Sequence, residues 1–298
     1  MSRSSMPSAN PHQAGLSNVA LAATFWGTTG PAVQLLHHSA GLSPAAIGFY
    51  RLAIAAVVLL IPVIRQFRTL TAAFWSAPLT LIVAGAGLGT YQALYFEAVA
   101  KSGVATATVI SLGLAPVLTT GWDCLQTRRL PAPLHGWSLT AALAGLALIS
   151  SLGNTPTAAT PQPLLGAAAA VGSGVGYAAT TILTRDILNR VAPTALTGAS
   201  TAIGALVLLP VALHGTGITF ALRPVTAGML GYLGVVTTAA AYALFHSGLR
   251  TVSAGAAALV TLLEPLTATV LATLILNEPI SPALTAGSVL LLSAVVMT

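Results

Sequence analysis

Long apolar runs separated by short polar connections dominate this chain. A helix needs about 20 mostly apolar residues to cross a bilayer. The runs that meet this length are roughly residues 16–37, 44–64, 76–98, 104–125, 133–152, 164–184, 194–213, 225–246, 254–276 and 282–298. The connections hold most of the charges, prolines and polar clusters. The pattern predicts an all-α integral membrane protein with ten transmembrane helices.

Two segments fall outside the predicted spans. Residues 1–15 are polar and lack the basic-then-apolar order of a cleaved signal peptide, so we expect a disordered cytoplasmic tail. Residues 153–163 are uncharged and rich in Thr and Pro, which is typical of a linker. The predicted organisation is therefore a first five-helix unit over 16–152, an external linker over 153–163 and a second five-helix unit over 164–298.

The composition excludes an ordinary soluble domain. Residues are 55% hydrophobic and only 5% charged, whereas soluble domains carry about 25% charged residues. The net charge of +6 arises from basic residues scattered singly between apolar runs, so we interpret it as a membrane-topology signal and expect no nucleic-acid partner. The expected partner outside the protein is the lipid bilayer.

The distribution of basic residues predicts the orientation. If the N-terminus lies in the cytoplasm, Lys101 and Arg223 fall outside, and Arg51 lies within a span. The basic residues that then fall inside are Arg3, Arg65, Arg68, Arg128, Arg129, Arg185, Arg190 and Arg250. This excess satisfies the positive-inside rule. We expect both termini in the cytoplasm.

An internal repeat with an offset of 149 residues relates the two halves. Matching pairs are Pro44 and Pro193, Pro116 and Pro265, Pro133 and Pro282, Gly27 and Gly176, Gly85 and Gly234, Phe96 and Phe245, and Lys101 and Arg250. Pro7 also matches Pro156, but a tail and a linker have no reason to correspond. A unit of five helices crosses the membrane an odd number of times, so the second copy must be inverted. Inverted repeats are a common plan of secondary transporters, whose substrate sites lie at mid-membrane.

Two ionisable residues lie deep within predicted spans, where a charge costs about 2.5–3.5 kcal/mol on insertion scales. Arg51 lies in the second span and Glu264 in the ninth, near mid-depth. Arg51 is either a buried structural anchor or part of a gate. For Glu264 we favour a role in transport or gating over a structural role. Glu97, Asp123 and His246 lie near span ends and could reach the polar headgroups.

Prolines and glycines predict irregular helices at three places. Pro265 follows Glu264, and its repeat mate Pro116 lies in the middle of the fourth span. A proline inside a helix removes one donor and frees one carbonyl, which can create a hinge or merely a kink. The segment Trp26-Gly27-Thr28-Thr29-Gly30-Pro31 in the first span favours a broken helix. Interrupted spans are pointers to transporter sites.

Polar and aromatic residues within the spans are candidates for a substrate cavity. Tyr91 and Tyr95 are four residues apart and share a helix face, with Gln92 beside them. Tyr95 could instead be an interfacial anchor, and Tyr91 and Gln92 could instead form bonds between helices. The predicted cavity residues are Trp26, Thr28, Tyr91, Gln92, Tyr95, Tyr177, Tyr242 and Glu264. Two pairs of glycines, Gly85 with Gly89 and Gly172 with Gly176, indicate close helix packing.

Enzymatic function finds little support. Gly198-Ala199-Ser200-Thr201 faintly resembles the serine motif of rhomboid proteases, but the glycine after the serine is missing. The sequence has no run of metal ligands, Walker loop or dinucleotide fingerprint. The single cysteine, Cys124, cannot form an intrachain disulfide. We therefore expect no catalytic residues, no metal and no cofactor.

Two motifs resemble a known family. Phe49-Tyr50-Arg51-Leu52 resembles the aromatic-Arg signature of EamA-type repeats, and Leu263-Glu264-Pro265, followed by Asn277-Glu278-Pro279, resembles the end of their fourth helix. These proteins form part of the drug/metabolite transporter superfamily, and the resemblance covers residues 16–298. Each intact motif occurs once: Ala115-Pro116 lacks the Glu, Arg128-Arg129 replaces the acidic ending, and Ser200 replaces the Arg.

The resemblance implies a ten-helix carrier of the bacterial inner membrane that exports small metabolites, often with an ion gradient such as protons. YddG-type exporters of amino acids, including aromatic ones, are a subgroup that fits. The alternatives are a multidrug or nucleotide-sugar carrier and a non-transporting membrane scaffold. A carrier should have a wet central cavity lined by Trp26, Tyr91, Tyr177 and Glu264, and a scaffold should be packed shut.

Overall fold

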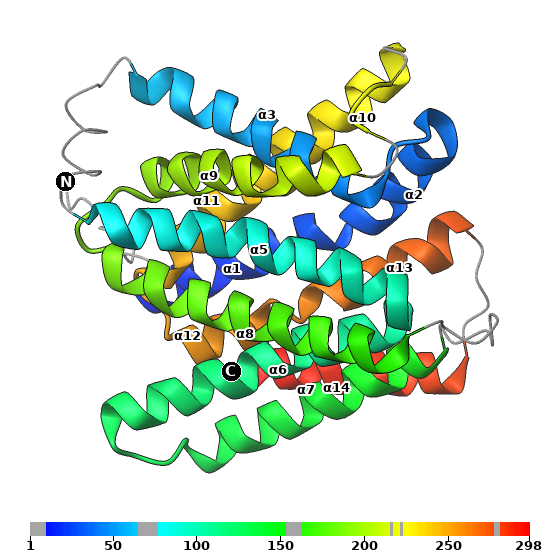
Figure 1. The fold of residues 1–298 in the computed structure, drawn as a ribbon. Helices are drawn as coiled ribbons and strands as arrows, with labels where there is room; N and C mark the ends of the chain where they lie inside the picture. The colour runs from blue at the N-terminus through cyan, green and yellow to red at the C-terminus, as the bar shows by residue number, and fades with distance from the viewer. Residues whose placement is uncertain (1–9, 65–76, 153–161, 215–216, 221–222, 277–280) are drawn as a thin grey trace, which may run out of the picture.

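The structure is a computed structural model that describes residues 10–64, 77–152, 162–214, 217–220, 223–276 and 281–298. Within these ranges the regular elements are all helical and run roughly antiparallel across one bundle (Figure 1). The helices of the first half are α1 (Pro11–Gly27), α2 (Thr29–Ala40), α3 (Pro44–Ile64), α5 (Pro78–Ser102), α6 (Val104–Thr127) and α7 (Pro133–Leu152). Those of the second half are α8 (Pro163–Ile187), α9 (Pro193–His214), α10 (Pro224–Gly234), the π-helix η1 (Val235–Ala240), α11 (Ala241–Leu249), α12 (Ala254–Val260), α13 (Leu263–Leu276) and α14 (Pro282–Val296).

Eight helical segments of the described chain are long and apolar enough to cross a membrane. One of them joins α10, η1 and α11, and another runs from α12 into α13. The first predicted span is divided into α1 and α2, of 17 and 12 residues, and the last is the 15-residue α14. The chain is thus a multi-pass helical membrane protein, and the predicted number of ten spans stays a prediction.

The predicted disordered tail is corrected at its C-terminal end. α1 begins at Pro11, and residues 11–15 are helical. The side chain of Asn10 accepts a hydrogen bond from the backbone nitrogen of His12, and Pro11 occupies the first helical position, which a proline favours. These two signals start the helix before the apolar run. Residues 1–9 lie outside the described ranges.

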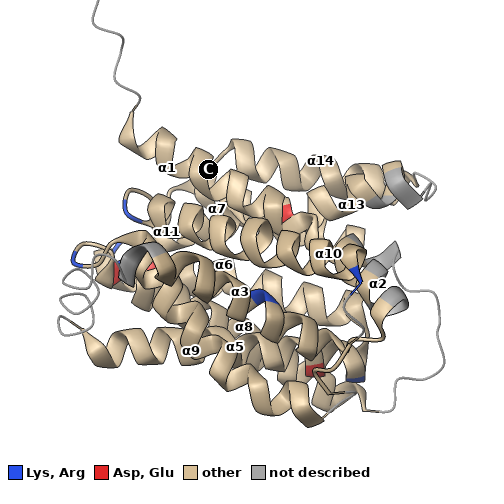
Figure 2. Cartoon of the chain, turned by 90° about the horizontal axis from the view of Figure 1, so that it is seen from above, with Lys and Arg blue, Asp and Glu red and all other residues tan. Residues whose placement is uncertain are grey.

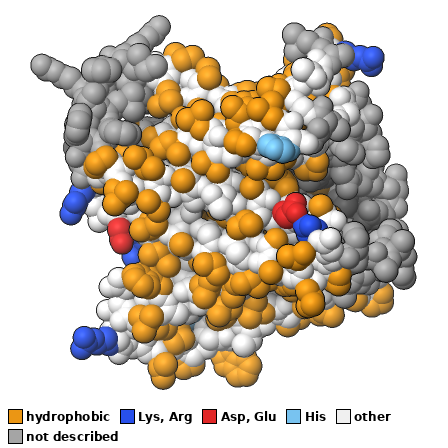
Figure 3. Space-filling view, viewed as in Figure 1, with side chains coloured by type: hydrophobic (Ala, Val, Ile, Leu, Met, Phe, Trp, Pro, Cys, Tyr) orange, Lys and Arg blue, Asp and Glu red, His pale blue; other side chains and the backbone are white. Residues whose placement is uncertain are grey.

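Large apolar side chains face outward along the helices, as lipid contact requires. Leu79, Val104, Trp137 and Leu206 are all more than 60% exposed. Figure 3 shows hydrophobic side chains spread over the middle of one face, and Figure 2 shows that charged positions are few and lie mostly toward the helix ends. The outer surface is therefore matched to hydrocarbon rather than to water.

Small residues allow the interior helices to approach closely, since apolar burial gives little drive inside lipid. A Cβ atom on Gly89 of α5 would lie 2.6 Å from the carbonyl oxygen of Gly204 in α9. A Cβ atom on Gly176 of α8 would lie 2.9 Å from the Cβ of Tyr91. The predicted packing roles of the two glycine pairs are confirmed, because Gly85 also contacts α9 and Gly172 contacts Leu94.

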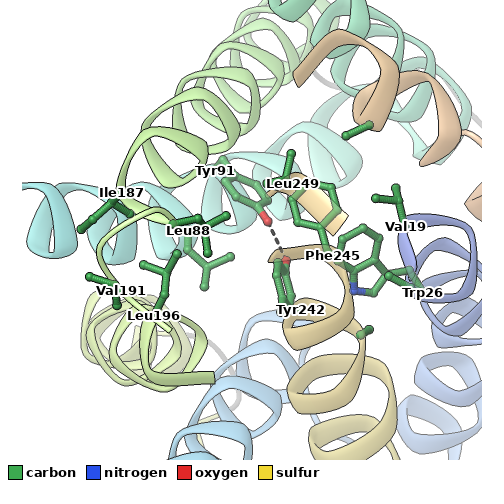
Figure 4. Packing of buried hydrophobic residues seen from close by; sticks show 14 of the residues in the cluster. Val19, Trp26, Leu88, Tyr91, Ile187, Val191, Leu196, Tyr242, Phe245 and Leu249 are labelled. Atoms are coloured by element: carbon green, nitrogen blue, oxygen red, sulfur yellow. Dashed lines mark hydrogen bonds between the residues drawn. The ribbon is translucent and has the colours of Figure 1, made fainter. Parts of the chain in front are cut away.

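The two halves of the chain are interlocked. α1 packs against α11 and α13 of the second half, while α8 packs against α5 and α6 of the first half. α3 pairs with α9, and α7 pairs with α14. The main buried cluster accordingly mixes residues of both halves, including Val19 and Tyr91 with Leu196 and Tyr242 (Figure 4).

Candidate transport site

Two interrupted helices meet near the middle of the bundle. α1 ends at Gly27, and α12 ends at Val260 before α13 starts at Leu263. Each break lies next to a proline, Pro31 or Pro265, which cannot donate to the carbonyl of the residue four positions earlier. The predicted break in the first span is confirmed. By contrast Pro116 lies inside the unbroken helix α6, so the proline pair does not act symmetrically.

The two breaks are in direct contact. A Cβ atom on Gly27 would lie 2.6 Å from the carbonyl oxygen of Glu264 and 2.5 Å from the Cβ of Thr267. Only glycine permits this approach of α1 to α13. Glu264 lies in the first turn of α13, where the partial positive charge of the helix end favours a carboxylate. The half-buried Glu264 carboxylate makes no ion pair within 4 Å among the described residues.

Arg51, in α3, bonds to the π-helix η1 rather than to Glu264. Its Nε donates to Oγ1 of Thr238 at 3.2 Å, and Thr238 Oγ1 donates to the carbonyl of Leu233, five residues earlier, at 2.8 Å. π-helical segments are frequent at functional sites. The charges of Arg51 and Glu264 lie near enough to interact electrostatically. The centre of the bundle therefore contains a guanidinium group and a carboxyl group that are not bonded to each other.

Aromatic side chains surround these groups and connect the halves. The hydroxyl groups of Tyr91 and Tyr242 form a hydrogen bond of 2.6 Å (Figure 4). Trp26 packs edge-on against Tyr242 with ring centroids 4.9 Å apart, and Tyr91 packs against Tyr177 at 5.4 Å. Tyr177 also donates to Oγ1 of Thr261, at 3.5 Å, beside the second break. Sequence reasoning missed Phe245, which stacks on Tyr177 and contacts Trp26.

The predicted wet central cavity is far smaller than expected. The space between α5, α8, α9 and α11 holds about 20 Å³, which suffices for about one water molecule. Of the predicted cavity residues, Tyr91, Tyr177 and Tyr242 line it, whereas Trp26, Thr28, Gln92, Tyr95 and Glu264 do not. The aromatic rings and the Tyr91–Tyr242 bond fill most of this space.

The remaining predicted site residues have other neighbours. Thr28 lies at the first break, where its Oγ1 donates to the carbonyl of Phe25 and bonds to the hydroxyl of Tyr232, both at 2.7 Å. The Tyr95 hydroxyl bonds to Thr108 Oγ1 at 2.9 Å, so Tyr95 connects α5 to α6. Gln92 is half-buried.

His246 does not reach the headgroups as expected. Its side chain is buried, and its Nδ1 bonds to Thr197 Oγ1 at 2.8 Å. Ser200 lines the central cavity beside His246 but has no hydrogen-bond partner in the described structure, so the two form no Ser–His pair.

Three buried polar atoms near the breaks and the cavity lack partners among the described residues: Trp26 Nε1, Thr29 Oγ1 and Ser200 Oγ. An unsatisfied buried donor costs about 1–3 kcal/mol. Such orphaned groups in native structures require an explanation, such as a function or an unseen water. No cluster of three or more His, Cys, Asp or Glu side chains suited to a metal occurs in the described part of the chain. The Asn277-Glu278-Pro279 motif lies outside the described residues.

Sequence comparison decides the family. A family model described as EamA-like transporter family matches residues 13–151 and again residues 164–298. The chain belongs to this family. It is a membrane transporter.

Two bacterial relatives are also similar over most of their length. The uncharacterized transporter YwfM of Bacillus subtilis is 34% identical over 231 residues, which cover 76% of this chain and 74% of the relative. The uncharacterized inner membrane transporter YicL of Salmonella typhimurium is 27% identical over 237 residues, covering 78% and 77%. One solved crystal structure superposes with a TM-score of 0.80 over 96% of each chain at 17% identity, a likeness that concerns the fold alone.

Proposed function

We propose that this EamA-family transporter is a secondary carrier that exports small metabolites, with amino acids as its substrate class, by alternating access. The observation that carries the proposal is the contact between the two interrupted helices at Gly27 and Glu264. Discontinuous spans place helix ends and polar backbone groups at mid-membrane, where transporters bind solutes and ions. A passive scaffold has no need for two breaks that meet.

The groups around the breaks suit a small amphipathic solute. Arg51 and Glu264 offer opposite charges that do not neutralise each other directly. Trp26, Tyr91 and Tyr177 offer aromatic faces, and the unpaired Trp26 Nε1 offers a donor. An amino acid has a carboxylate, an ammonium group and a side chain, and it can use all three kinds of partner. An aromatic side chain would gain the most from the rings.

Export requires the centre to open, because about 20 Å³ cannot hold an amino acid. The Tyr91–Tyr242 bond joins α5 of the first half to α11 of the second. Its rupture costs only about 1 kcal/mol, the usual net value of such a bond. Relative movement of the halves around the central residues would then expose them to one side of the membrane at a time.

An inverted repeat would supply the two equivalent gates. In such a repeat α1 corresponds to α8, α5 to α10–α11, and α6 to α12–α13. The contacts follow this correspondence: α8 packs on α5 and α6, and α1 packs on their counterparts α11 and α13. The remaining corresponding helices pack directly against each other, α3 against α9 and α7 against α14. The two matches to one family model support the same duplication.

Charge supports the proposed orientation. Five described arginines, Arg128, Arg129, Arg185, Arg190 and Arg250, follow or end α6, α8 and α11 at one end of the bundle. Lys101, in the last turn of α5, and Arg223, just before α10, lie at the other end of the bundle. The first end faces the cytoplasm under the positive-inside rule. Arg3, Arg65 and Arg68 lie outside the described residues. We place the carrier in the bacterial inner membrane.

Transport by purified protein in proteoliposomes tests the proposal. The twenty amino acids, a nucleotide sugar and a lipophilic cationic drug are assayed separately, each with and without an imposed pH gradient. We expect amino acid movement that depends on the protein, and accumulation when protons drive it. Movement of the sugar nucleotide or the drug alone would favour those substrate classes, and no movement of any solute would favour a scaffold.

A further inference from the structure

A second, much larger cavity lies at the end of the bundle where α6 and α8 end and α7 and α12 begin. It holds about 410 Å³, within the range of small-molecule sites. We call it the end cavity. Its charged and titratable lining residues are Asp123, Arg129, His135, Arg185 and Asp186, and Cys124 also lines it. In the proposed orientation it opens toward the cytoplasm, the side from which an exporter loads.

The opposite charges in the end cavity do not pair with one another. Among the described residues, the ion pair found within 4 Å joins Glu97 and Lys101. These two residues lie in the last turns of α5, at the other end of the bundle from the end cavity. Asp123 Oδ2 accepts a bond from the backbone nitrogen of Gly255 at 2.8 Å, and Arg185 Nε donates to the carbonyl of Val252 at 3.1 Å. Each of these two side chains keeps further polar atoms for another partner.

Arg129 and Asp186 are still freer. Both are exposed, and neither side chain makes a hydrogen bond or ion pair within the described structure. Opposite charges around one cavity usually attract each other, so their separation leaves space for a ligand that satisfies both signs. Two guanidinium groups match a carboxylate in geometry, and two carboxylates accept from an ammonium group.

We propose that the end cavity is a loading site that binds solutes carrying both an ammonium and a carboxylate group. The proposal rests on the proposed export function and extends it to a selective site outside the central residues. The lining carries two formal positive and two formal negative charges from Arg and Asp, so it favours a neutral zwitterion over a simple anion or cation. A cavity for phosphate or another anion would instead have an excess of cations.

The end cavity is connected to the second helix break. Asp123 contacts the start of α12, and the other end of this helix is Thr261, which accepts from Tyr177. A ligand that draws Asp123 toward its ammonium group pulls on α12. Loading is thereby linked to the aromatic groups that close the centre.

The test uses Cys124, the one cysteine of the chain, as a reporter of occupancy. Protein in nanodiscs is treated with a maleimide, and the labelling rate is measured with L-leucine or L-phenylalanine. The controls are the matching amines, 3-methylbutylamine and phenethylamine, and the matching acids, 4-methylpentanoate and 3-phenylpropanoate. We expect at least one amino acid to slow labelling, and its amine and acid to need about tenfold higher concentrations or more, since each lacks one charge-assisted contact.

Variants separate recognition from general effects. Arg129→Gln and Asp186→Asn change exposed side chains without hydrogen bonds, so both proteins should fold, and each should weaken protection by about tenfold. Arg190→Gln is the matched control, because Arg190 is exposed near the same end but does not line the cavity. Its protection should equal that of the wild type.

The proposal is overturned if neither amino acid protects Cys124, if the amines or acids protect as well as the zwitterions, or if both variants keep wild-type protection. Protection without transport in proteoliposomes would uphold the zwitterion-binding site and remove the proposed export function. Transport of amino acids without protection would do the reverse.

Discussion

Glu264 is the residue whose chemistry most directly affects the proposed mechanism. Its carboxylate lies at the contact of two broken helices and is not ion-paired with Arg51, which is bonded to Thr238 instead. A permanent ion pair would have made Glu264 a structural anchor, and breaking such a buried pair costs about 3–5 kcal/mol. Without that pair the carboxylate is available to bind and release a proton or a substrate ammonium group.

Glu264→Gln separates these roles because it preserves shape and removes the charge. We expect a protein that folds and still exchanges substrate, yet no longer accumulates it against a gradient. The reason is that the amide cannot take up and release a proton as a carboxyl group does. Proteoliposome uptake with and without a pH gradient measures this. Glu97→Gln, which changes a carboxylate paired with Lys101 near a helix end, should behave as the wild type. Normal accumulation by a well-folded Glu264→Gln protein would remove the carboxylate from the mechanism.

The hydroxyl bond between Tyr91 and Tyr242 should stabilise the closed centre. Tyr91→Phe removes it while keeping the ring, and we expect a loss of about 1 kcal/mol in stability. Adding Tyr242→Phe should cost little more, because the shared bond is already lost. Thermal unfolding in detergent measures the single and double variants.

Tyr95→Phe is the control for this cycle, since Tyr95 bonds to Thr108 within the first half. It should lower stability by a similar amount and leave the Tyr91–Tyr242 coupling unchanged. Strictly additive losses for Tyr91→Phe and Tyr242→Phe would show that the bond contributes nothing in the membrane-protein fold.

At the scale of the helices, irregularity is not shared equally by corresponding elements. α1 and α12–α13 are interrupted, and the span of α10 and α11 contains a π-helix, whereas α8, α6 and α5 are continuous. A proline alone does not explain this asymmetry, because Pro116 lies inside the continuous α6 whereas Pro265 lies beside a break. The two breaks nevertheless lie at one contact, between Gly27 and Glu264.

Pro265→Ala tests whether the second break is required. Alanine restores a backbone donor four residues after Thr261 and favours a continuous helix. We expect higher thermal stability together with transport lowered by about tenfold, equivalent to about 1.4 kcal/mol. Pro116→Ala is the control, because α6 is already continuous there. Transport by Pro265→Ala at the wild-type rate would contradict a role for the break.

At the scale of the whole molecule, the arrangement joins the halves too closely for either to be an independent body. α1 is packed among helices of the second half, and α8 among helices of the first. The movement that the proposed export requires would therefore slide these contacts rather than open a hinge between two separate domains. The glycine contacts between α5 and α9 give smooth, closely packed surfaces for such a movement.

Orientation is testable in cells. A cysteine introduced at Thr157, in a Cys124→Ser background, should react with a membrane-impermeant maleimide added outside intact spheroplasts, because the linker is predicted to be external. A cysteine at Ser2 should react only after the membrane is made permeable. Labelling of Thr157→Cys only after permeabilisation would reverse the predicted topology.

The sequence by itself determined the class of protein and most helix bounds. Hydrocarbon tolerates few charges, so apolar length predicted 44–64 and 133–152 with the same bounds as α3 and α7. Local chemistry also predicted a broken helix within Trp26–Pro31, where the structure ends α1 at Gly27. These features depend on residues near one another in the chain.

Only the tertiary structure decided which side chains meet. Helix packing bonded Arg51 to Thr238 rather than to Glu264, and it brought Tyr91 of the first half to Tyr242 of the second. Helix packing also placed His246 in the core and gathered Asp123, Arg185 and Asp186 around one cavity. Such contacts depend on how helices distant in sequence rotate and cross, and periodicity within a single span contains no information about that geometry.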